Sequence, residues 1–247
     1  MIDFSTLKNL TIPEGSVKEI AIGGVTVWKN EPGVGDSVFM NVDGVRTEFI
    51  IVHIGRPSTY YYDSSCDGTW LLMKDCYTQR QWSNVPYGIT YTPDAYIFYY
   101  LQSTFFNLLD ADIRSIVKEV KIPFTADPEY ANVGEDGWNR KVFLLSVNEV
   151  IDADIGNQNQ DGVPLKYFEN ARGTTKTLAY YNGNPVNWVT RTLDTAVDTD
   201  EVFFITSSAN GGWGGYFTGS QNNTYGIRPA MILPSPLRVD ENNNVIV

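Results

Sequence analysis

The sequence has few of the residues that most often carry chemistry. Its 247 residues include one histidine, His53, and two cysteines, Cys66 and Cys76. One histidine cannot build a multi-histidine metal site, and there is no Gly-x-Ser-x-Gly, phosphate-loop or well-placed Cys–His pattern. We therefore expect no enzymatic activity. Two cysteines cannot staple a chain of this length, and we expect free thiols, with one local bridge as the alternative.

Basic residues and long apolar runs are also scarce. The chain has 18 Lys and Arg against 29 Asp and Glu, which gives a formal net charge of −11. Phosphate backbones are bound by clustered positive charge, so we expect no nucleic-acid partner. There is no apolar run of about 18 residues, and residues 1–15 lack the basic-then-apolar pattern of a secretory leader. We expect cytoplasmic synthesis and no membrane insertion.

Glycine and aromatic residues are abundant instead. The chain contains 21 Gly, 15 Tyr and 6 Trp, and 43% of its residues are hydrophobic, enough for a substantial core. Aromatic residues mixed with Gly, Asn and Ser are typical of adaptable contact surfaces. A turn-rich β core has a similar composition, so composition alone leaves both interpretations open.

Turn signals divide the chain into two parts. A hairpin is expected around Gly23 and Gly24, and the break at Asn30–Gly33 separates a small β module, residues 1–32, from a larger domain, residues 33–247. A second hairpin is expected around Asp43 and Gly44. Further strands are expected over residues 69–75 and 141–150, within 186–194 and 201–212, and in the segments that follow.

Two helices are expected between these strands. Thr92 and Pro93 form a start signal, and a second helix is capped by Asp110 and stopped by Pro123. Their inward apolar positions are Ile97, Leu101, Phe105 and Leu108 in the first helix, and Ile113, Ile116, Val117 and Val120 in the second. Strands on either side of two scaffold helices indicate the α+β class.

One loop has the pattern of a cation site. Asn157, Asn159 and Asp161 place side-chain oxygens at alternate positions before Gly162, as hard cations such as calcium prefer. Phe168 stands where the bidentate glutamate of such a loop would be, and an exposed polar loop is the alternative. A second acidic cluster, expected either to hold a cation or to be a solvated loop, comprises Asp194, Asp198, Asp200 and Glu201.

Three ordered motifs resemble an uncharacterised domain family of gut bacteria and their phages. They are Lys141-Val-Phe-Leu-Leu-Ser-x-x-Glu-Val150, Asn187-Trp-Val-Thr-Arg-Thr192 and Tyr225-Gly-Ile-Arg-Pro-Ala230, and the resemblance covers residues 34–234. The usual second motif is W-L-R-S, so this chain carries an inserted residue there.

That family resembles the C-type-lectin-like fold of formylglycine-generating-type domains and phage variable receptor-binding proteins. The oxidising relatives need a late cysteine pair, which this chain lacks.

The resemblance implies a ligand surface just before the last motif. In the phage proteins this surface is in some cases diversified by retroelements. Carried over to this chain, the expected ligand-binding residues are Ser207, Ser208, Asn210, Trp213, Tyr216, Ser220, Asn222, Asn223 and Tyr225. Three motif residues are expected to be structural framework instead, namely Trp188, Arg191 and Arg228.

Residues 1–30 resemble the N-terminal segment of Gram-positive phage tail and baseplate proteins. Together the two resemblances imply a virion tail protein that attaches through residues 1–32 to other tail proteins, forms a homotrimer, and recognises a bacterial surface glycan or protein. Two alternatives stay open. One is a glycan hydrolase, which needs two carboxyl groups about 5–10 Å apart. The other is a structural virion component without a ligand of its own.

Overall fold

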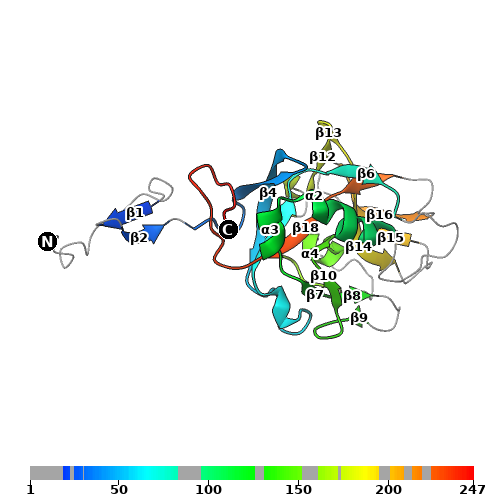
Figure 1. Ribbon diagram of the computed structural model, residues 1–247. Coiled ribbons are helices and arrows are strands. Elements are labelled where there is room, and N and C mark those ends of the chain that lie inside the picture. The colour runs from blue at the N-terminus through cyan, green and yellow to red at the C-terminus, as the bar shows by residue number, and fades with distance from the viewer. Residues whose placement is uncertain are drawn as a thin grey trace.

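The computed structural model describes residues 19–22, 25–29, 31–82, 96–125, 131–151, 161–171, 174–194, 201–208, 213–218 and 224–247. Within these ranges the protein is mostly β-sheet with a few short helices (Figure 1), which agrees with an α+β or mainly β class. No helix in the described ranges is long and apolar enough to cross a membrane.

Five antiparallel strands form the first of two large sheets among the described residues. Its order is β11-β18-β5-β4-β3. The bounds of these strands are β3 Ser37–Val42, β4 Val45–Ile54, β5 Thr69–Met73, β11 Val142–Phe143 and β18 Ala230–Leu233. The strands expected around Asp43 and at residue 69 are therefore confirmed.

Both faces of this sheet are buried. Ile51 and Leu71 pack into one hydrophobic cluster, and their neighbours Ile50 and Leu72 pack into another. Successive side chains of a strand point to opposite faces, so this alternation places a core on each side of the sheet. For this reason the Thr-Trp-Leu-Leu-Met sequence of β5 is buried at every position.

A second five-stranded sheet has the order β16-β15-β14-β17-β6. Strands β14 and β17 run parallel, with Trp188 opposite Gly226, and the other neighbours are antiparallel. Its strands are β6 Thr78–Arg80, β14 Trp188–Asp194, β15 Glu201–Ile205, β16 Trp213–Thr218 and β17 Tyr225–Ile227.

Four two-stranded sheets are also present among the described residues. They are β1 (Glu19–Ile22) with β2 (Val25–Lys29), β7 (Val120–Ile122) with β10 (Trp138–Arg140), β8 (Phe124–Thr125) with β9 (Ala131–Asn132), and β12 (Tyr180–Tyr181) with β13 (Asn184–Pro185). The antiparallel pair β1–β2 confirms the first expected hairpin. The division at residues 32 and 33 stays a prediction.

The first expected helix is present in altered form. It consists of α1 (Tyr96–Tyr99), a π-helix (Tyr100–Phe105) and α2 (Phe106–Leu108), and its expected start at Thr92 and Pro93 lies outside the described residues. Ile97, Leu101 and Phe105 are buried as expected, but Leu109 is buried where Leu108 was expected. A π-helix has more residues per turn than an α-helix, so residues four apart, such as Leu101 and Phe105, stay on one face.

The second expected helix is shorter than predicted. Helix α3 spans Ala111–Ile116, Val117 is already extended, and Val120 belongs to strand β7. The prediction that Val117 and Val120 are helical was therefore wrong. Val120 and Ile122 are buried on either side of the half-buried Lys121, and this period of two is that of a strand.

The strand expected over residues 141–150 was also wrong beyond its start. Only Val142–Phe143 form β11, and Ser146 then caps helix α4, Val147–Val150. The side chain of Ser146 accepts a hydrogen bond from the amide of Glu149, while the Glu149 carboxylate accepts one from the amide of Ser146. This reciprocal capping box ends the strand and starts the helix.

Candidate functional site

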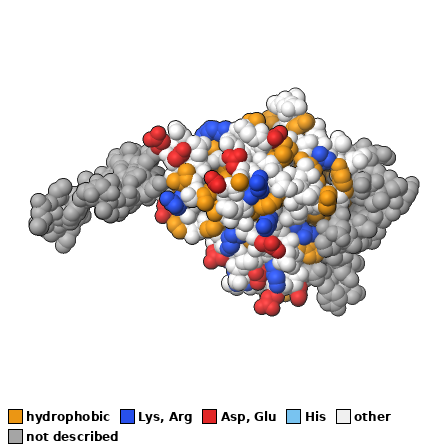
Figure 2. Space-filling view, viewed as in Figure 1, with side chains coloured by type: hydrophobic (Ala, Val, Ile, Leu, Met, Phe, Trp, Pro, Cys, Tyr) orange, Lys and Arg blue, Asp and Glu red, His pale blue; other side chains and the backbone are white. Residues whose placement is uncertain are grey.

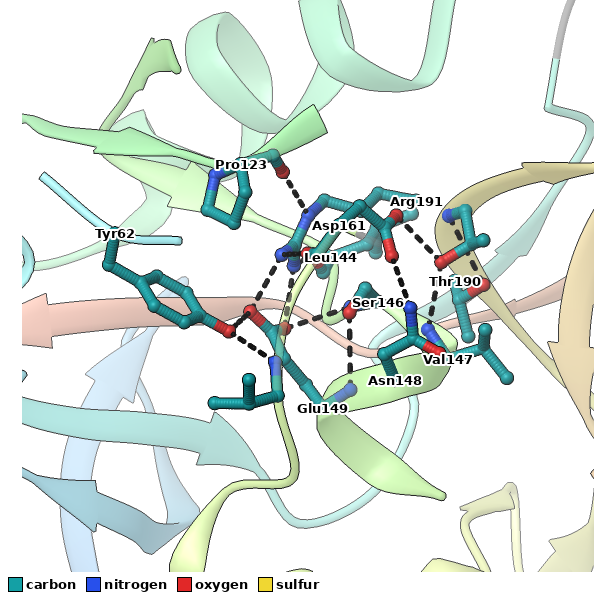
Figure 3. A network of polar contacts seen from close by, with 12 residues as sticks. Tyr62, Pro123, Leu144, Ser146, Val147, Asn148, Glu149, Asp161, Thr190 and Arg191 are labelled. Atoms are coloured by element: carbon teal, nitrogen blue, oxygen red, sulfur yellow. Dashed lines mark hydrogen bonds and ion pairs between the residues drawn. The ribbon is translucent and has the colours of Figure 1, made fainter. Parts of the chain in front are cut away.

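Two of the three motifs, residues 141–150 and 187–192, meet in a buried polar network (Figure 3). Arg191 of β14 donates two hydrogen bonds to the carboxylate of Glu149 in α4, from Nη1 to Oε2 and from Nη2 to Oε1, each 2.6 Å long. Both side chains are 0% exposed. A planar guanidinium facing a carboxylate in this way gives two parallel charge-assisted hydrogen bonds, which fix the geometry of the pair.

Backbone carbonyls take the remaining donors of Arg191. Its Nε donates to Pro123 O at 2.9 Å, Nη1 to Leu144 O at 2.9 Å and Nη2 to Asp161 O at 2.7 Å. With the two bonds to Glu149, all five N–H donors of a guanidinium are used. Burial by itself would lower the pKa of Arg191, but the Glu149 carboxylate raises it above its ordinary value.

Tyr62 extends the network toward the first sheet. Its hydroxyl donates to Glu149 Oε1 at 2.8 Å and accepts from the amide of Val163 at 3.2 Å. Burial, and then the negative charge of Glu149, raise the pKa of Tyr62 well above 10. The phenol therefore stays a neutral donor, and it ties the loop before β5 to α4.

Asp161 forms the other end of the network. Its Oδ2 accepts from the hydroxyl of Thr192 at 2.8 Å, and its Oδ1 accepts from the side-chain amide Nδ2 of Asn148 at 3.2 Å. Thr192 Oγ1 in turn accepts from the amide of Val147 at 2.9 Å. Burial raises the pKa of Asp161 to about 6 against the opposing effect of Arg191.

This network explains the motifs structurally. Ser146 and Glu149 come from the first motif, and Arg191 and Thr192 come from the second. Their polar atoms bond to one another and to main-chain groups inside the protein. An arginine whose donors are all engaged has none left for a ligand, so the network acts as a clamp that joins α4 to β14.

The other framework residues pack between the two sheets. The buried Trp188 donates from Nε1 to Thr177 O at 2.9 Å, and the guanidinium of Arg228 lies 5.0 Å from the centre of its ring. Arg228 donates from Nε to Met73 O at 2.8 Å. A Cβ on Gly226 would lie 2.5 Å from Cys76 Sγ, so the glycine of the third motif allows β17 to approach this site closely.

Five of the nine expected ligand-binding residues lie on or next to strands β15, β16 and β17 of the second sheet. Ser207 and Ser208 follow β15, Trp213 and Tyr216 belong to the edge strand β16, and Tyr225 begins β17. The amide of Ser207 donates to Asn187 Oδ1 at 2.8 Å, Ser208 is exposed, and the ring of Tyr225 lies 5.2 Å from that of Phe204. The rest of the expected surface lies outside the described residues: Asn210, Ser220, Asn222 and Asn223.

The expected cation loop is described only at its end. Asn157 and Asn159 lie outside the described residues, and the carboxylate oxygens of Asp161 accept the hydrogen bonds of Asn148 and Thr192. Asp198 and Asp200 of the second acidic cluster also lie outside the described residues. Within the described ranges no three His, Cys, Asp or Glu side chains are grouped for a metal ion.

The two cysteines and the histidine are buried or half-buried in the described structure. Cys66 and Cys76 are unpaired and buried, and burial raises the pKa of each thiol to about 12. His53 is half-buried, and its Nδ1 accepts from the amide of Lys166 at 3.3 Å. Burial lowers the pKa of His53 below its ordinary value, so the ring is neutral at pH 7.

A pocket not anticipated from the sequence lies beside the first sheet. Its volume is about 450 Å³, and three segments line it: the β3–β4 hairpin, the end of β5 with the loop to β6, and the β12–β13 turn. Its lining residues are Val42, Asp43, Val45, Thr47, Met73, Asp75, Cys76, Tyr77, Tyr180, Tyr181, Asn182 and Gly183. The three segments are more than a hundred residues apart at their extremes, and no local sequence pattern joins them.

Charge on the visible surface is mixed. In Figure 2, Lys and Arg side chains are interspersed with Asp and Glu over the face shown, without a large patch of either sign. That face therefore shows no basic surface of the kind that phosphate backbones require.

Comparison with known proteins identifies a family without an assigned activity. The model of a domain of unknown function, DUF6273, matches residues 67–235, more than half of the chain, and this stretch contains all three motifs. No curated protein and no solved structure gives a significant match.

Proposed function

Because the chain belongs to the DUF6273 family, whose function is unknown, we propose its role from its own residues: a phage or prophage tail protein that recognises a bacterial surface ligand without catalysis. The observation that supports this most is the grouping of the expected contact residues. Ser207, Trp213 and Tyr216 lie on or just after the neighbouring strands β15 and β16, and Tyr225 begins β17 of the same sheet, with its ring 5.2 Å from that of Phe204 in β15.

The scaffold beneath these residues is suited to presenting a contact surface. Strand β14 carries Arg191 and lies between β15 and β17, and the clamp holds it to α4. Recognition sites gain precision when rigid elements hold them. The proposal includes a C-type-lectin-like fold and a homotrimer in the virion. Residues 1–32 would attach to other tail proteins, and the ligand would be a bacterial surface glycan or protein.

Binding of the purified protein to whole bacterial cells tests the proposal. Aromatic residues at the centre of a contact surface often contribute about tenfold or more to affinity, so Trp213→Ala and Tyr216→Ala should each weaken binding by about this factor. Tyr99→Ala is the matched control, because Tyr99 is 67% exposed on α1, and α1 contacts β6 at the opposite edge of the second sheet from β16. Wild-type binding by both Trp213→Ala and Tyr216→Ala would reject the proposed surface and favour a structural virion component.

The pocket keeps the glycan-hydrolase alternative open for test. It contains two carboxylic acids, Asp43 and Asp75, and paired carboxyl groups are what such enzymes use. Release of reducing sugar from purified cell-wall or capsule glycan, lost in Asp43→Asn and Asp75→Asn, would establish hydrolysis. If no sugar is released, the pocket is left with a binding role only.

A further inference from the structure

We propose that the pocket between the β3–β4 hairpin, the β5–β6 loop and the β12–β13 turn binds an organic ammonium group, of the kind carried by amino sugars and by lysine side chains. This site lies on different strands from the Ser207–Tyr225 surface, and the proposal does not depend on the function proposed above. It rests on the shape of the pocket, its aromatic lining and its charge.

The size of the pocket suits a small ligand or one unit of a larger one. A volume of about 450 Å³ falls in the lower part of the range of about 300–1,000 Å³ that small-molecule sites occupy. Main-chain contacts fix its walls. Asp43 N donates to Leu108 O at 2.8 Å, and Cys76 N donates to Tyr180 O at 2.9 Å, so the hairpin and the β12 wall are each tied to a neighbouring segment.

The lining favours a cation with an apolar body. Three tyrosines contribute, Tyr77, Tyr180 and Tyr181, and the π-face of a tyrosine attracts ammonium groups. Tyr180 is 40% exposed, which leaves it accessible to a ligand. Burial, and then the negative charge of Asp43, raise the pKa of Tyr77, which agrees with the Asp43 carboxylate lying close to this ring.

The charge of the lining also favours a cation. Asp43 and Asp75 are exposed carboxylates, and no lysine or arginine is among the lining residues. Nearby cations have other partners: Lys74 pairs with Glu48 at 2.8 Å, and Arg80 donates to the hydroxyl of Tyr96 at 2.6 Å.

Two positive charges interact with the Asp75 carboxylate: the buried guanidinium of Arg228 and the exposed ammonium group of Lys74. Arg228 is bound to Met73 O, Lys74 is paired with Glu48, and neither is part of the lining, so the lining itself is negatively charged.

Calorimetric titration with matched probes tests the proposal. The probes are a glucosamine tetramer, its fully N-acetylated form, and Nα-acetyl-lysine amide. The glucosamine tetramer should bind and the N-acetylated form should not, because acetylation removes the charge. Binding of the lysine derivative as well would indicate recognition of any ammonium group, whereas binding of the tetramer alone would indicate an amino sugar. Equal binding of the charged and N-acetylated tetramers, or no binding of either ammonium probe, would overturn the proposal.

Isosteric variants locate the site. In Asp75→Asn the Oδ1 atom that accepts from the amide of Tyr180 at 3.1 Å is kept, so the loop should hold its position while the charge is lost. Each of Asp43→Asn and Asp75→Asn should weaken binding about threefold, and the double variant about tenfold. Asp67→Asn is the control, because Asp67 is exposed just before β5, at the opposite end of that strand from the pocket.

Hydrogen exchange of the wild-type protein supplies a readout that needs no variant. The glucosamine tetramer should slow exchange of amides in residues 43–47 and 180–183 and leave residues 201–208 unchanged. Protection confined to residues 201–208 would place the ligand on the other surface and overturn the assignment. Loss of cell binding in Trp213→Ala with unchanged titration of the pocket probe would separate the two sites.

Discussion

The buried carboxylate of Glu149 accepts hydrogen bonds from Arg191, Tyr62 and Ser146. Removing one partner of a buried ion pair leaves the other charge uncompensated and costs about 3–5 kcal/mol. We expect Glu149→Gln to lower the free energy of unfolding by this amount, measured by urea denaturation.

Glu119→Gln, at an exposed position, should change little. The double variant Glu149→Gln/Arg191→Met should lose less free energy of unfolding than the two single variants lose together, because neither charge remains unpaired. Additive losses would contradict a coupled pair.

Asp161 gives the protein a specific dependence on pH. Its pKa is raised from its ordinary 3.8 to about 6 in the folded state. Between these pH values the folded protein holds a proton that the unfolded chain has lost, so stability from this group falls as the pH rises from about 4 to 6. One pKa unit corresponds to about 1.4 kcal/mol, so the loss is at most about 3 kcal/mol.

Asp161→Asn should remove this fall, because the amide cannot ionise. Urea unfolding followed by tryptophan fluorescence at pH 4.5 and pH 6.5 measures it, with Glu119→Gln again as the exposed control. If the wild type and Asp161→Asn show the same difference between the two pH values, Asp161 is not the group responsible.

At the scale of elements, β17 can approach β14 and the first sheet only because residue 226 is glycine. A Cβ there would lie 2.5 Å from Cys76 Sγ and 3.2 Å from Asn187 O. Overpacking of this kind costs about 1–3 kcal/mol, and we expect Gly226→Ala to lower the thermal midpoint accordingly. Adding Cys76→Ala removes the nearest atom and should recover part of the loss. No recovery would indicate that the backbone contact dominates.

The elements that the sequence predicted best are those with a strong local pattern. The Asp43-Gly44 hairpin formed as expected, with both residues at positive φ, 53° and 71°. The prediction of a strand over residues 141–150 was wrong because it followed the apolar run and not the Ser146-x-x-Glu149 capping box. That capping box is a local pattern that could have been recognised. The prediction that Val120 is helical was wrong because Val120 pairs with Arg140 of β10, which is 20 positions further along the chain.

The candidate sites follow the same division. Arg191 could be singled out from its motif, but its partners Tyr62 and Asp161 come from distant segments. The pocket could not be predicted at all, since Asp43, Asp75 and Tyr180 are brought together only by the pairing of separate strands. Long-range pairing of this kind has no local signature in a single sequence.

For the whole molecule, the two thiols report on global unfolding. Cys66 and Cys76 are buried, and a pKa of about 12 leaves almost no reactive thiolate at pH 8. We expect both to react with a thiol reagent only as fast as the protein unfolds, and both to react at once in 6 M guanidinium. Rapid reaction of one thiol in the native protein would show that its surroundings open locally.

The first sheet joins residues from both ends of the described domain. Strand β18 lies between β5 and β11, and Asn244 receives a 2.8 Å hydrogen bond from Arg46, across 198 positions of sequence. During synthesis, β5 can pair with β4, but its other edge has no partner strand until β18, residues 230–233, has been made. Contacts this far apart in sequence slow folding, and exposed strands of this kind aggregate readily. Until β18 has formed, the open edge of β5 therefore exposes the growing chain to aggregation with other chains.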